Sequence, residues 1–391
     1  MTFPLLSESL THMLPGDPAP GFSLRTVKHA KFALESMGGR YLVLCFFGSA
    51  SESHAQRACK AAYSRPDLFD DKHASFFGVS IDPTDESEAR LTHRSPGHRH
   101  FYDFDLKAAK LYGALPRTAS PTNALDGLMR QWVIIDPTMR VIAAIPFQAD
   151  QGDIIATISL VEGLNPPARF AGTELMAPIL YLPRVFEPEL CRHLIGVYEA
   201  EGGKESGFMR EVEGRTLGVL DPRFKRRKDV TLKDDRLIRE LQMRFVRRVV
   251  PEIAKVHQFK VTRMERNIVA CYAAEDGGHF SAHRDNDSKG TAHRRFAVSV
   301  NLNDDFEGGE VSFPEYGSRS YKASPGGAVV FSCSLLHKVS KVTQGQRYAF
   351  LPFLYDDAAA RIRKENAHFI GPEKTQPGDT EAEAQPAEAV A

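Results

Sequence analysis

The sequence lacks the features of a disulfide-bonded or zinc-binding protein. Its 391 residues include an odd number of cysteines, which are widely scattered and form neither a CxxC pair nor a zinc-ligand spacing: Cys45, Cys59, Cys191, Cys271 and Cys333. Small disulfide scaffolds and structural zinc sites both depend on closely spaced, paired cysteines. The cysteine pattern therefore argues against both classes.

The sequence also lacks a net charge of either sign and a long apolar run. The 50 basic and 50 acidic residues balance, so no overall field gathers nucleic acid or anionic membranes. No segment approaches the roughly 18 apolar residues of a membrane-spanning helix, and the N-terminus has neither a basic region nor an apolar run of signal length. We expect a cytoplasmic protein that binds neither nucleic acid nor membranes.

The length favours two domains, and the first half has an α/β pattern. Apolar runs typical of strands alternate with stretches that suit helices: strands at 41–47, 75–82 and 130–136, and helices near 55–63 and 106–112. After these, the Pro-Pro pair and glycines of GLNPPARFAGTELMAP break the periodicity. We therefore predict an α/β domain over residues 1–165 and a linker over 166–177.

The second half changes from helical to strand patterns. Two helices are expected at 188–201 and 235–257, the second with apolar residues at helical spacing. From 264 to 355 short strands alternate with glycine turns, which is typical of an antiparallel sandwich or jelly roll. We place this domain at 178–358 and a C-terminal tail at 359–391, disordered from about 372, where aromatic residues are absent.

Candidate metal ligands occur near the end of one predicted strand and just beyond another. His283 and Asp285 lie two residues apart, so their side chains leave the same face, and His337 follows the strand GGAVVFSC. Two histidines and one carboxylate on one side of a metal leave positions open, as in non-haem iron(II) oxygenases. Ten residues after His337 comes Arg347, whose guanidinium is suited to a bidentate carboxylate.

These elements resemble the prolyl-hydroxylase-like branch of the 2-oxoglutarate/iron(II) dioxygenases. The resemblance covers roughly 176–357 and rests on IVACY, HRD, SVNLN, FEGGEVSFPE and SPGGAVVFS, followed by His337 and Arg347. It implies a double-stranded β-helix fold, iron(II), 2-oxoglutarate and O₂, and possible use of L-ascorbate. It further implies that Arg347 and Tyr272 bind the distal carboxylate of 2-oxoglutarate, that Asn301 lines the site, and that Gly308 and Gly309 form a turn.

Other polar residues of this half have simpler interpretations. His279 and His293 are interpreted as solvated loop histidines, because neither has an aspartate two residues later. The basic run RFKRRKD at 223–229 suits an acidic substrate or phosphate, but a solvated loop is the favoured interpretation in so charge-rich a protein.

The first half resembles the peroxiredoxin branch of the thioredoxin superfamily over roughly residues 15–160. The resemblance rests on LPGDPAPGFSL, YLVLCFF, FFGVSIDPTD, LYGAL and RQWVIIDPTMRVI, with Arg130 at the place of the family's second arginine. Where the family has its reactive cysteine, this chain has Ser51, His54 or Ala55, depending on the register. None of these forms a sulfenic acid. We therefore expect a degenerate redoxin that serves packing, substrate presentation or binding of a protein partner.

Three functions remain open from the sequence. The favoured hypothesis is a dioxygenase that hydroxylates a C–H bond, with prolyl residues of a protein or peptide as the leading substrate and free amino acids or other small molecules as alternatives. The second is a thiol peroxidase or redoxin that uses Cys59, one helical turn beyond Ala55. The third is a binding protein without turnover.

Overall fold

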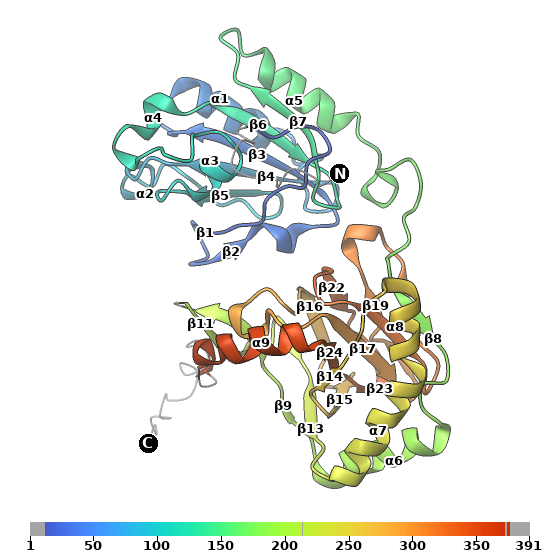
Figure 1. The fold of residues 1–391 in the computed structure, drawn as a ribbon. Helices are drawn as coiled ribbons and strands as arrows, with labels where there is room; N and C mark the ends of the chain where they lie inside the picture. Colours follow the sequence, from blue (N-terminus) through green and yellow to red (C-terminus); the bar gives the residue numbers. More distant parts are fainter. Residues whose placement is uncertain (1–11, 213, 372–373, 376–391) are drawn as a thin grey trace, which may run out of the picture. The chain divides into compact units, whose positions relative to one another are not determined.

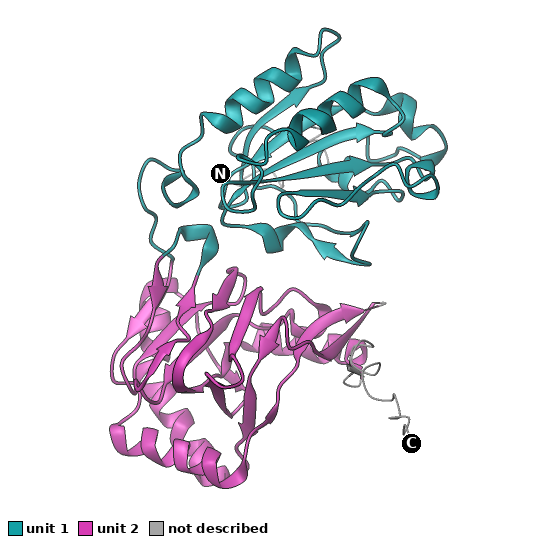
Figure 2. Ribbon diagram, turned by 180° about the vertical axis from the view of Figure 1, so that it is seen from behind, with its two compact units in different colours: residues 1–177, 313–318 teal, residues 178–312, 319–391 magenta. Residues whose placement is uncertain are grey.

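The computed structural model describes residues 12–212, 214–371 and 374–375. The chain forms two compact units (Figure 2). Unit 1 comprises residues 1–177 and 313–318, and unit 2 comprises residues 178–312 and 319–391. Among the described residues, no helix has the length and apolar character needed to cross a membrane.

Unit 1 is a seven-stranded sheet with helices on both faces, as the α/β pattern predicts (Figure 1). The strand order is β2-β1-β5-β4-β3-β6-β7, and β3, β4 and β5 run parallel. The strands are β1 (Ser23–Thr26), β2 (Phe32–Ala33), β3 (Tyr41–Gly48), β4 (Ala74–Ser80), β5 (His98–Tyr102), β6 (Gln131–Ile135) and β7 (Val141–Pro146). The α-helices are α1 (Ser53–Tyr63), α2 (Thr84–Ser87), α3 (Lys107–Leu111), α4 (Ala124–Gly127) and α5 (Gly152–Glu162).

The central strand β3 explains why this sheet is covered on both sides. All eight of its residues are buried. Its side chains alternate between two hydrophobic clusters, with Leu42 and Leu44 in one and Val43 and Cys45 in the other. Alternate residues of a strand point to opposite faces, so a strand that is apolar throughout needs a layer on each face.

Unit 2 is built on two antiparallel sheets with helices packed against the larger one. The smaller sheet has the order β12-β16-β22-β19-β20, and the larger follows the path β14-β24-β17-β23-β15-β13-β9. The smaller sheet contains β12 (Lys225–Arg226), β16 (His279–His283), β19 (Val311–Ser312), β20 (Ser320–Tyr321) and β22 (His337–Val339). The larger contains β9 (Lys204–Glu205), β13 (Lys228–Thr231), β14 (Arg263–Glu265), β15 (Ile268–Ala273), β17 (Phe296–Asn301), β23 (Val342–Phe350) and β24 (Phe353–Tyr355), joined by β8 (Leu180–Leu182), β18 (Phe306–Gly308) and β21 (Ala328–Ser332).

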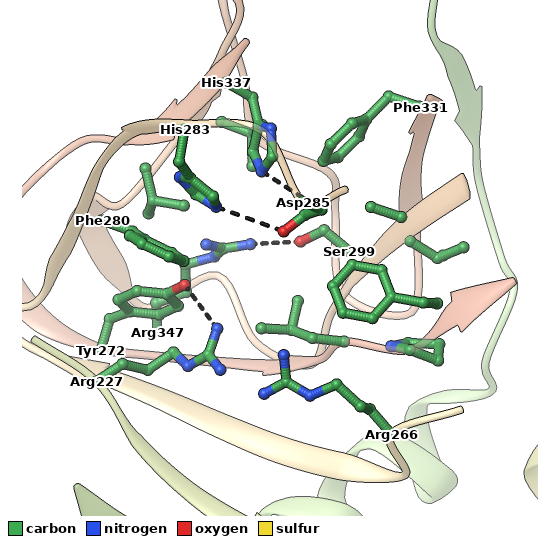
Figure 3. Close-up of a pocket in the computed structure, with 17 residues that line it drawn as sticks. Arg227, Arg266, Tyr272, Phe280, His283, Asp285, Ser299, Phe331, His337 and Arg347 are labelled. Atoms are coloured by element: carbon green, nitrogen blue, oxygen red, sulfur yellow. Dashed lines mark hydrogen bonds and ion pairs between the residues drawn. The ribbon is translucent and has the colours of Figure 1, made fainter. Parts of the chain in front are cut away.

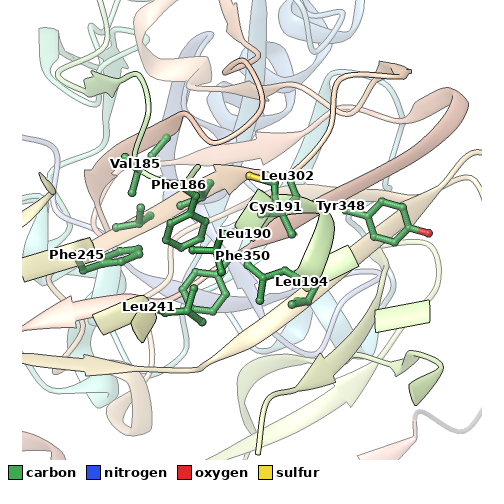
Figure 4. Close-up of a cluster of buried hydrophobic side chains, with 14 of the residues drawn as sticks. Val185, Phe186, Leu190, Cys191, Leu194, Leu241, Phe245, Leu302, Tyr348 and Phe350 are labelled. Atoms are coloured by element: carbon green, nitrogen blue, oxygen red, sulfur yellow. The ribbon is translucent and has the colours of Figure 1, made fainter. Parts of the chain in front are cut away.

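The helices of unit 2 bury one face of the larger sheet (Figure 4). Those that do so are α6 (Pro188–Glu201), α7 (Asp235–Arg248) and α8 (Val250–His257), whereas α9 (Asp357–Glu365) contributes no residue to this buried cluster. Leu194 of α6 and Phe245 of α7 share a cluster of buried residues with Phe350 of β23. This leaves the opposite face of the sheet for the smaller sheet and for the site, which is the jelly-roll arrangement predicted from the sequence.

Two boundaries differ from those predicted. The helix expected over 235–257 is broken at Val249, because Pro251 has no N–H for the helix ladder and instead occupies the first turn of α8. Ordered structure also continues beyond residue 358, where the predicted tail begins: the Asp356 carboxylate caps α9 by accepting a hydrogen bond from the Ala359 N–H. Of the segment predicted to be disordered from about 372, only Lys374–Thr375 are described, as β25 beside β11 (Arg215–Leu220). The remainder lies outside the described residues.

Candidate metal centre and substrate pocket

Strand pairing brings the three predicted metal ligands together. His283 is the last residue of β16, His337 is the first of β22, and the two face each other in the antiparallel register. Asp285 follows β16, where its N–H donates to the Cys333 carbonyl. One ligand atom from each of the three side chains lies within 4.8 Å of the others. The arrangement has the size and donor set of a metal centre.

Hydrogen bonds fix the orientation of both imidazoles. The Nδ1–H of His283 donates to the Ser281 carbonyl at 2.7 Å, and that of His337 donates to the Leu335 carbonyl at 3.0 Å. A carbonyl oxygen only accepts, so each Nδ1 carries the proton and each Nε2 keeps a lone pair. These Nε2 atoms lie 3.5 Å and 3.4 Å from the Asp285 carboxylate oxygens. The lone pairs and the carboxylate therefore converge on one point, as metal ligation requires.

Electrostatics favour the protonation states that bind a metal. Burial by itself raises the pKa of Asp285, but His337 and His283 outweigh it and hold that pKa well below the usual range. Burial, reinforced by His283, lowers the pKa of His337 to about 4. Near neutral pH the carboxylate is ionised and this imidazole is neutral, so metal binding displaces little or no proton from them.

The triad lies at one side of a pocket whose walls are mainly apolar and aromatic (Figure 3). The Phe280 ring stacks on His283 with ring centroids 3.5 Å apart, and Phe331 lies 4.6 Å from His337. Apolar walls limit the access of water to a metal and so strengthen its electrostatic effect on a bound group.

Arg347 lines the same pocket and has a polar group without a partner. Its side chain is only 2% exposed. Nε and Nη2 donate to Asn301 Oδ1 at 3.1 Å and 2.9 Å, and Nη2 also donates to Ser299 Oγ at 2.7 Å. Nη1 is buried without a hydrogen-bond partner among the described residues. Since buried donors are nearly always paired, Nη1 fits a bound group that accepts hydrogen bonds.

Tyr272 and Asn301 have different places in the site. Tyr272 of β15 faces Arg347 of β23 in the strand register, and its hydroxyl accepts a hydrogen bond from Arg227 Nη1 at 3.3 Å inside the pocket. Asn301 does not line the pocket, although the sequence predicted that it would. Its amide oxygen holds Arg347 in position while its Nδ2 donates to the Ala323 carbonyl.

The interpretation of the basic run 223–229 as a solvated loop is wrong. The run forms β12 and the start of β13, and Lys225 and Arg227 are 6% and 8% exposed. Lys225 Nζ donates to Ser206 Oγ at 2.8 Å. Arg227 forms a bidentate ion pair with Asp229, both contacts being 2.7 Å, and lines the pocket. Alternation along β12 and β13 directs every second basic side chain inward.

The two remaining histidines of this region are not part of the metal cluster. His279 binds the carbonyls of Gly277 and Arg223. His293 was expected to be solvated but is 3% exposed, and its Nε2 lies 3.0 Å from Glu265, a buried carboxylate that compensates the cost of burying the ring.

Comparison with known families separates the two halves of the chain. Residues 268–355, which contain the triad and Arg347, match the 2OG-Fe(II) oxygenase superfamily. Unit 2 contains a 2OG-Fe(II) oxygenase domain. Residues 15–144 match the AhpC/TSA family, so unit 1 contains an AhpC/TSA domain.

Two of the curated relatives are PKHD-type hydroxylases. A PKHD-type hydroxylase of Psychrobacter sp. (strain PRwf-1) is 38% identical over 87 residues, which are 20% of this chain and 34% of the relative. A PKHD-type hydroxylase of Pseudomonas putida (strain KT2440) is 37% identical over 91 residues, 21% of this chain and 39% of the relative. The chain thus spans between a third and two fifths of the length of these relatives.

Solved structures are similar to parts of the chain. A prolyl hydroxylase from Trichoplax adhaerens, in complex with a peptide of hypoxia inducible factor, has 16% identity and a TM-score of 0.39. The match covers 48% of this chain and 86% of the hydroxylase chain. Peroxidoxin BcpB from Mycobacterium tuberculosis has 18% identity and a TM-score of 0.33. The match covers 39% of this chain and 99% of the peroxidoxin chain.

The AhpC/TSA domain has no cysteine at the start of α1. Ala55 is buried in the first turns of this helix, and His54 binds the buried Asp153 at 3.1 Å. Ser51 Oγ lies 2.7 Å from Ser49 Oγ. Cys59 is 8% exposed, and burial raises its pKa to about 12. Its thiolate is therefore scarce at neutral pH, and thiol reactivity follows the thiolate.

The arginine at the family's conserved place has an alternative partner. Arg130 Nη2 forms an ion pair with Glu52, the residue that precedes α1. The guanidinium of Arg130 is thus paired with a carboxylate at the start of α1, a segment without a cysteine. The loss of thiol chemistry in this unit stays a prediction.

Proposed function

We propose that the oxygenase domain hydroxylates a C–H bond of its substrate and converts 2-oxoglutarate and O₂ into succinate and CO₂. The observation that carries the proposal is the combination of a two-histidine, one-carboxylate cluster with a buried arginine whose Nη1 lacks a partner. A packed core has no need of either feature, since the cluster directs two imidazole nitrogens at one buried carboxylate and the arginine leaves Nη1 unsatisfied.

Each side chain has a distinct part in this proposal. His283, Asp285 and His337 would hold iron(II), and three protein ligands leave metal positions for 2-oxoglutarate and O₂. Arg347 binds the distal carboxylate of 2-oxoglutarate through Nη1, with Tyr272 beside it. When bound, iron(II) and 2-oxoglutarate together supply the oxidising chemistry with O₂ that replaces C–H by C–OH. Asn301 acts indirectly, by orienting Arg347.

We also propose a substrate class, a reductant, a cellular location and binding partners. The naming of two partial relatives as PKHD-type hydroxylases supports hydroxylation, and we propose prolyl residues of a protein or peptide as the leading substrate. L-Ascorbate as a reductant for oxidised iron, a cytoplasmic location, the lack of nucleic-acid and membrane binding, and a protein partner for the AhpC/TSA domain remain predictions.

Formation of succinate tests the proposal. Purified protein with iron(II), 2-oxoglutarate and O₂ should produce succinate slowly without substrate and faster with an accepted one. The variant His283→Ala should lose this activity, whereas His279→Ala, which alters the other end of the same strand outside the triad, should keep it. Succinate formation by His283→Ala at the wild-type rate would refute the assignment.

A further inference from the structure

The pocket around the metal triad has more positive charge than the proposed function requires. Arg227, Arg266 and Arg347 line it, and Asp285 is its one acidic lining residue within the described part of the chain. Asp229 adds a second carboxylate through its ion pairs with Arg227 and Arg266. Three guanidiniums against two carboxylates leave a surplus of one positive charge.

The proposed cofactors do not remove this surplus. Iron(II) adds two positive charges and 2-oxoglutarate adds two negative charges, so together they leave the balance unchanged. An unpaired charge in a largely apolar pocket is costly unless a counter-ion binds there. The charge count therefore points to a further anion, which enters with the substrate.

The three arginines are not equally available to such an anion. Arg347 is assigned to 2-oxoglutarate. Arg227 is engaged with the Asp229 carboxylate, Ser206 Oγ and the Tyr272 hydroxyl. Arg266 has one long ion-pair contact among the described residues, 3.5 Å from Nη2 to Asp229, and its guanidinium carbon lies 5.6 Å from the centre of the Phe353 ring. Of its side chain, 32% is exposed. Arg266 is thus the guanidinium with donors left for a ligand from solution.

The backbone at Arg266 supports a role in binding. Arg266 lies in the turn between β14 and β15 with a φ of 64°, in the left-handed region that usually favours glycine or asparagine. Its guanidinium points into the pocket from the side opposite the histidines (Figure 3). Strained positions of this kind concentrate at ligand sites, where a side chain has to be aimed. Although burial lowers its pKa to about 10, Arg266 remains charged at neutral pH.

We propose that Arg266 binds a carboxylate of the substrate in the same pocket as the metal triad. The inference rests on the proposed function and narrows its substrate to an anionic molecule. The carboxylate belongs either to a free amino acid or chain terminus, or to an acidic side chain within a peptide. The guanidinium is suited to both because its planar donors match a carboxylate.

The experiment is an anaerobic calorimetric titration of the protein loaded with iron(II) and 2-oxoglutarate. The probes are N-acetylglycine, which presents a terminal carboxylate, N-acetyl-L-aspartic acid α-amide, which presents a side-chain carboxylate, and the neutral N-acetylglycinamide. The visible charge-transfer band of the loaded protein is recorded in parallel, so that displacement of 2-oxoglutarate is detected. We expect one carboxylate probe to bind about tenfold or more tightly than the amide, as a charge-assisted hydrogen bond provides.

Substitutions at two arginines provide the controls. Arg266→Gln should abolish the preference for the carboxylate and leave the affinity for 2-oxoglutarate unchanged, while Arg223→Gln, at a highly exposed position of the same basic run, should behave as the wild type. The tighter of the two carboxylates identifies the source of the anion. A wild type without preference for either carboxylate, or a preference retained in Arg266→Gln, overturns the inference. Absence of the band in wild-type protein overturns the proposed function itself.

Discussion

Replacing Arg347 by glutamine should weaken the binding of 2-oxoglutarate while leaving iron(II) binding intact. The guanidinium is 2% exposed, and its Nη1 is the buried donor without a partner. Loss of charge-assisted hydrogen bonds to a buried carboxylate costs about 2–4 kcal/mol. Since about 1.4 kcal/mol corresponds to a tenfold change, the Kd for 2-oxoglutarate should rise about 30- to 700-fold.

The assay is an anaerobic titration of iron(II)-loaded protein with 2-oxoglutarate. Arg347→Lys should lie between wild type and Arg347→Gln, because lysine keeps the charge but loses the planar pair of donors. Iron(II) affinity serves as the control for folding, since Arg347 is not among the three residues of the metal cluster. A variant Arg347→Gln that binds both iron(II) and 2-oxoglutarate as the wild type does would refute the role of this arginine.

Three further predictions concern other parts of the molecule. Peroxide followed by dimedone should leave Cys59 unlabelled, because burial raises its pKa to about 12; a dimedone adduct at Cys59 by mass spectrometry would contradict this. Burial by itself raises the pKa of Glu265, but His293 and Arg294 outweigh burial and hold this pKa at about 2. The stability that the ionised Glu265 contributes to the folded protein is therefore present above pH 4.5 and is lost as the pH falls towards 2. Glu265→Gln should therefore lower the free energy of unfolding at pH 7 by about 2–3 kcal/mol and make that free energy depend less on pH below about 4.5. If the free energy of unfolding of the variant fell with pH in parallel to that of the wild type, this role of Glu265 would be contradicted. Phe245→Ala in the cluster of Figure 4 should cost about 3–5 kcal/mol in urea unfolding of unit 2, whereas a loss below about 1 kcal/mol would show that the cluster is loosely packed.

The sequence predicts the metal cluster well because its signals are local. His283 and Asp285 are two residues apart, and their position at a strand end already places them together. His337 and Arg347 required only the order of successive strands in a known family. The central strand β3 was equally clear, since an apolar run without alternation implies burial on both faces.

The residues missed by the sequence depend on contacts between distant segments. Arg227 lines the pocket from its position between β12, which pairs with β16, and β13, which pairs with β15, and nothing in the run RFKRRKD by itself separates inward from outward side chains. Likewise, His293 is buried because Glu265, distant in sequence, provides its partner. Residues 225–228 are all basic, so the run has no alternation of polar and apolar residues from which the burial of Lys225 and Arg227 could be predicted.

The AhpC/TSA domain combines a complete core with a first helical turn that has no cysteine. Its sheet and both hydrophobic clusters are complete, but the position beside Arg130 is taken by Glu52 instead of a thiolate. Packing depends on the apolar side chains, whereas reactivity depends on one low-pKa sulfur. That unit 1 serves as a scaffold for a substrate or a partner stays a prediction.

The central claim is tested most directly by adding iron(II) and 2-oxoglutarate to the purified apoprotein without oxygen. Chelation of iron(II) by a 2-oxo acid gives a weak visible charge-transfer band, which we predict for the wild type and for His279→Ala and which His283→Ala should lose. A folded wild-type protein that binds iron(II) but gives no band with saturating 2-oxoglutarate would contradict the account.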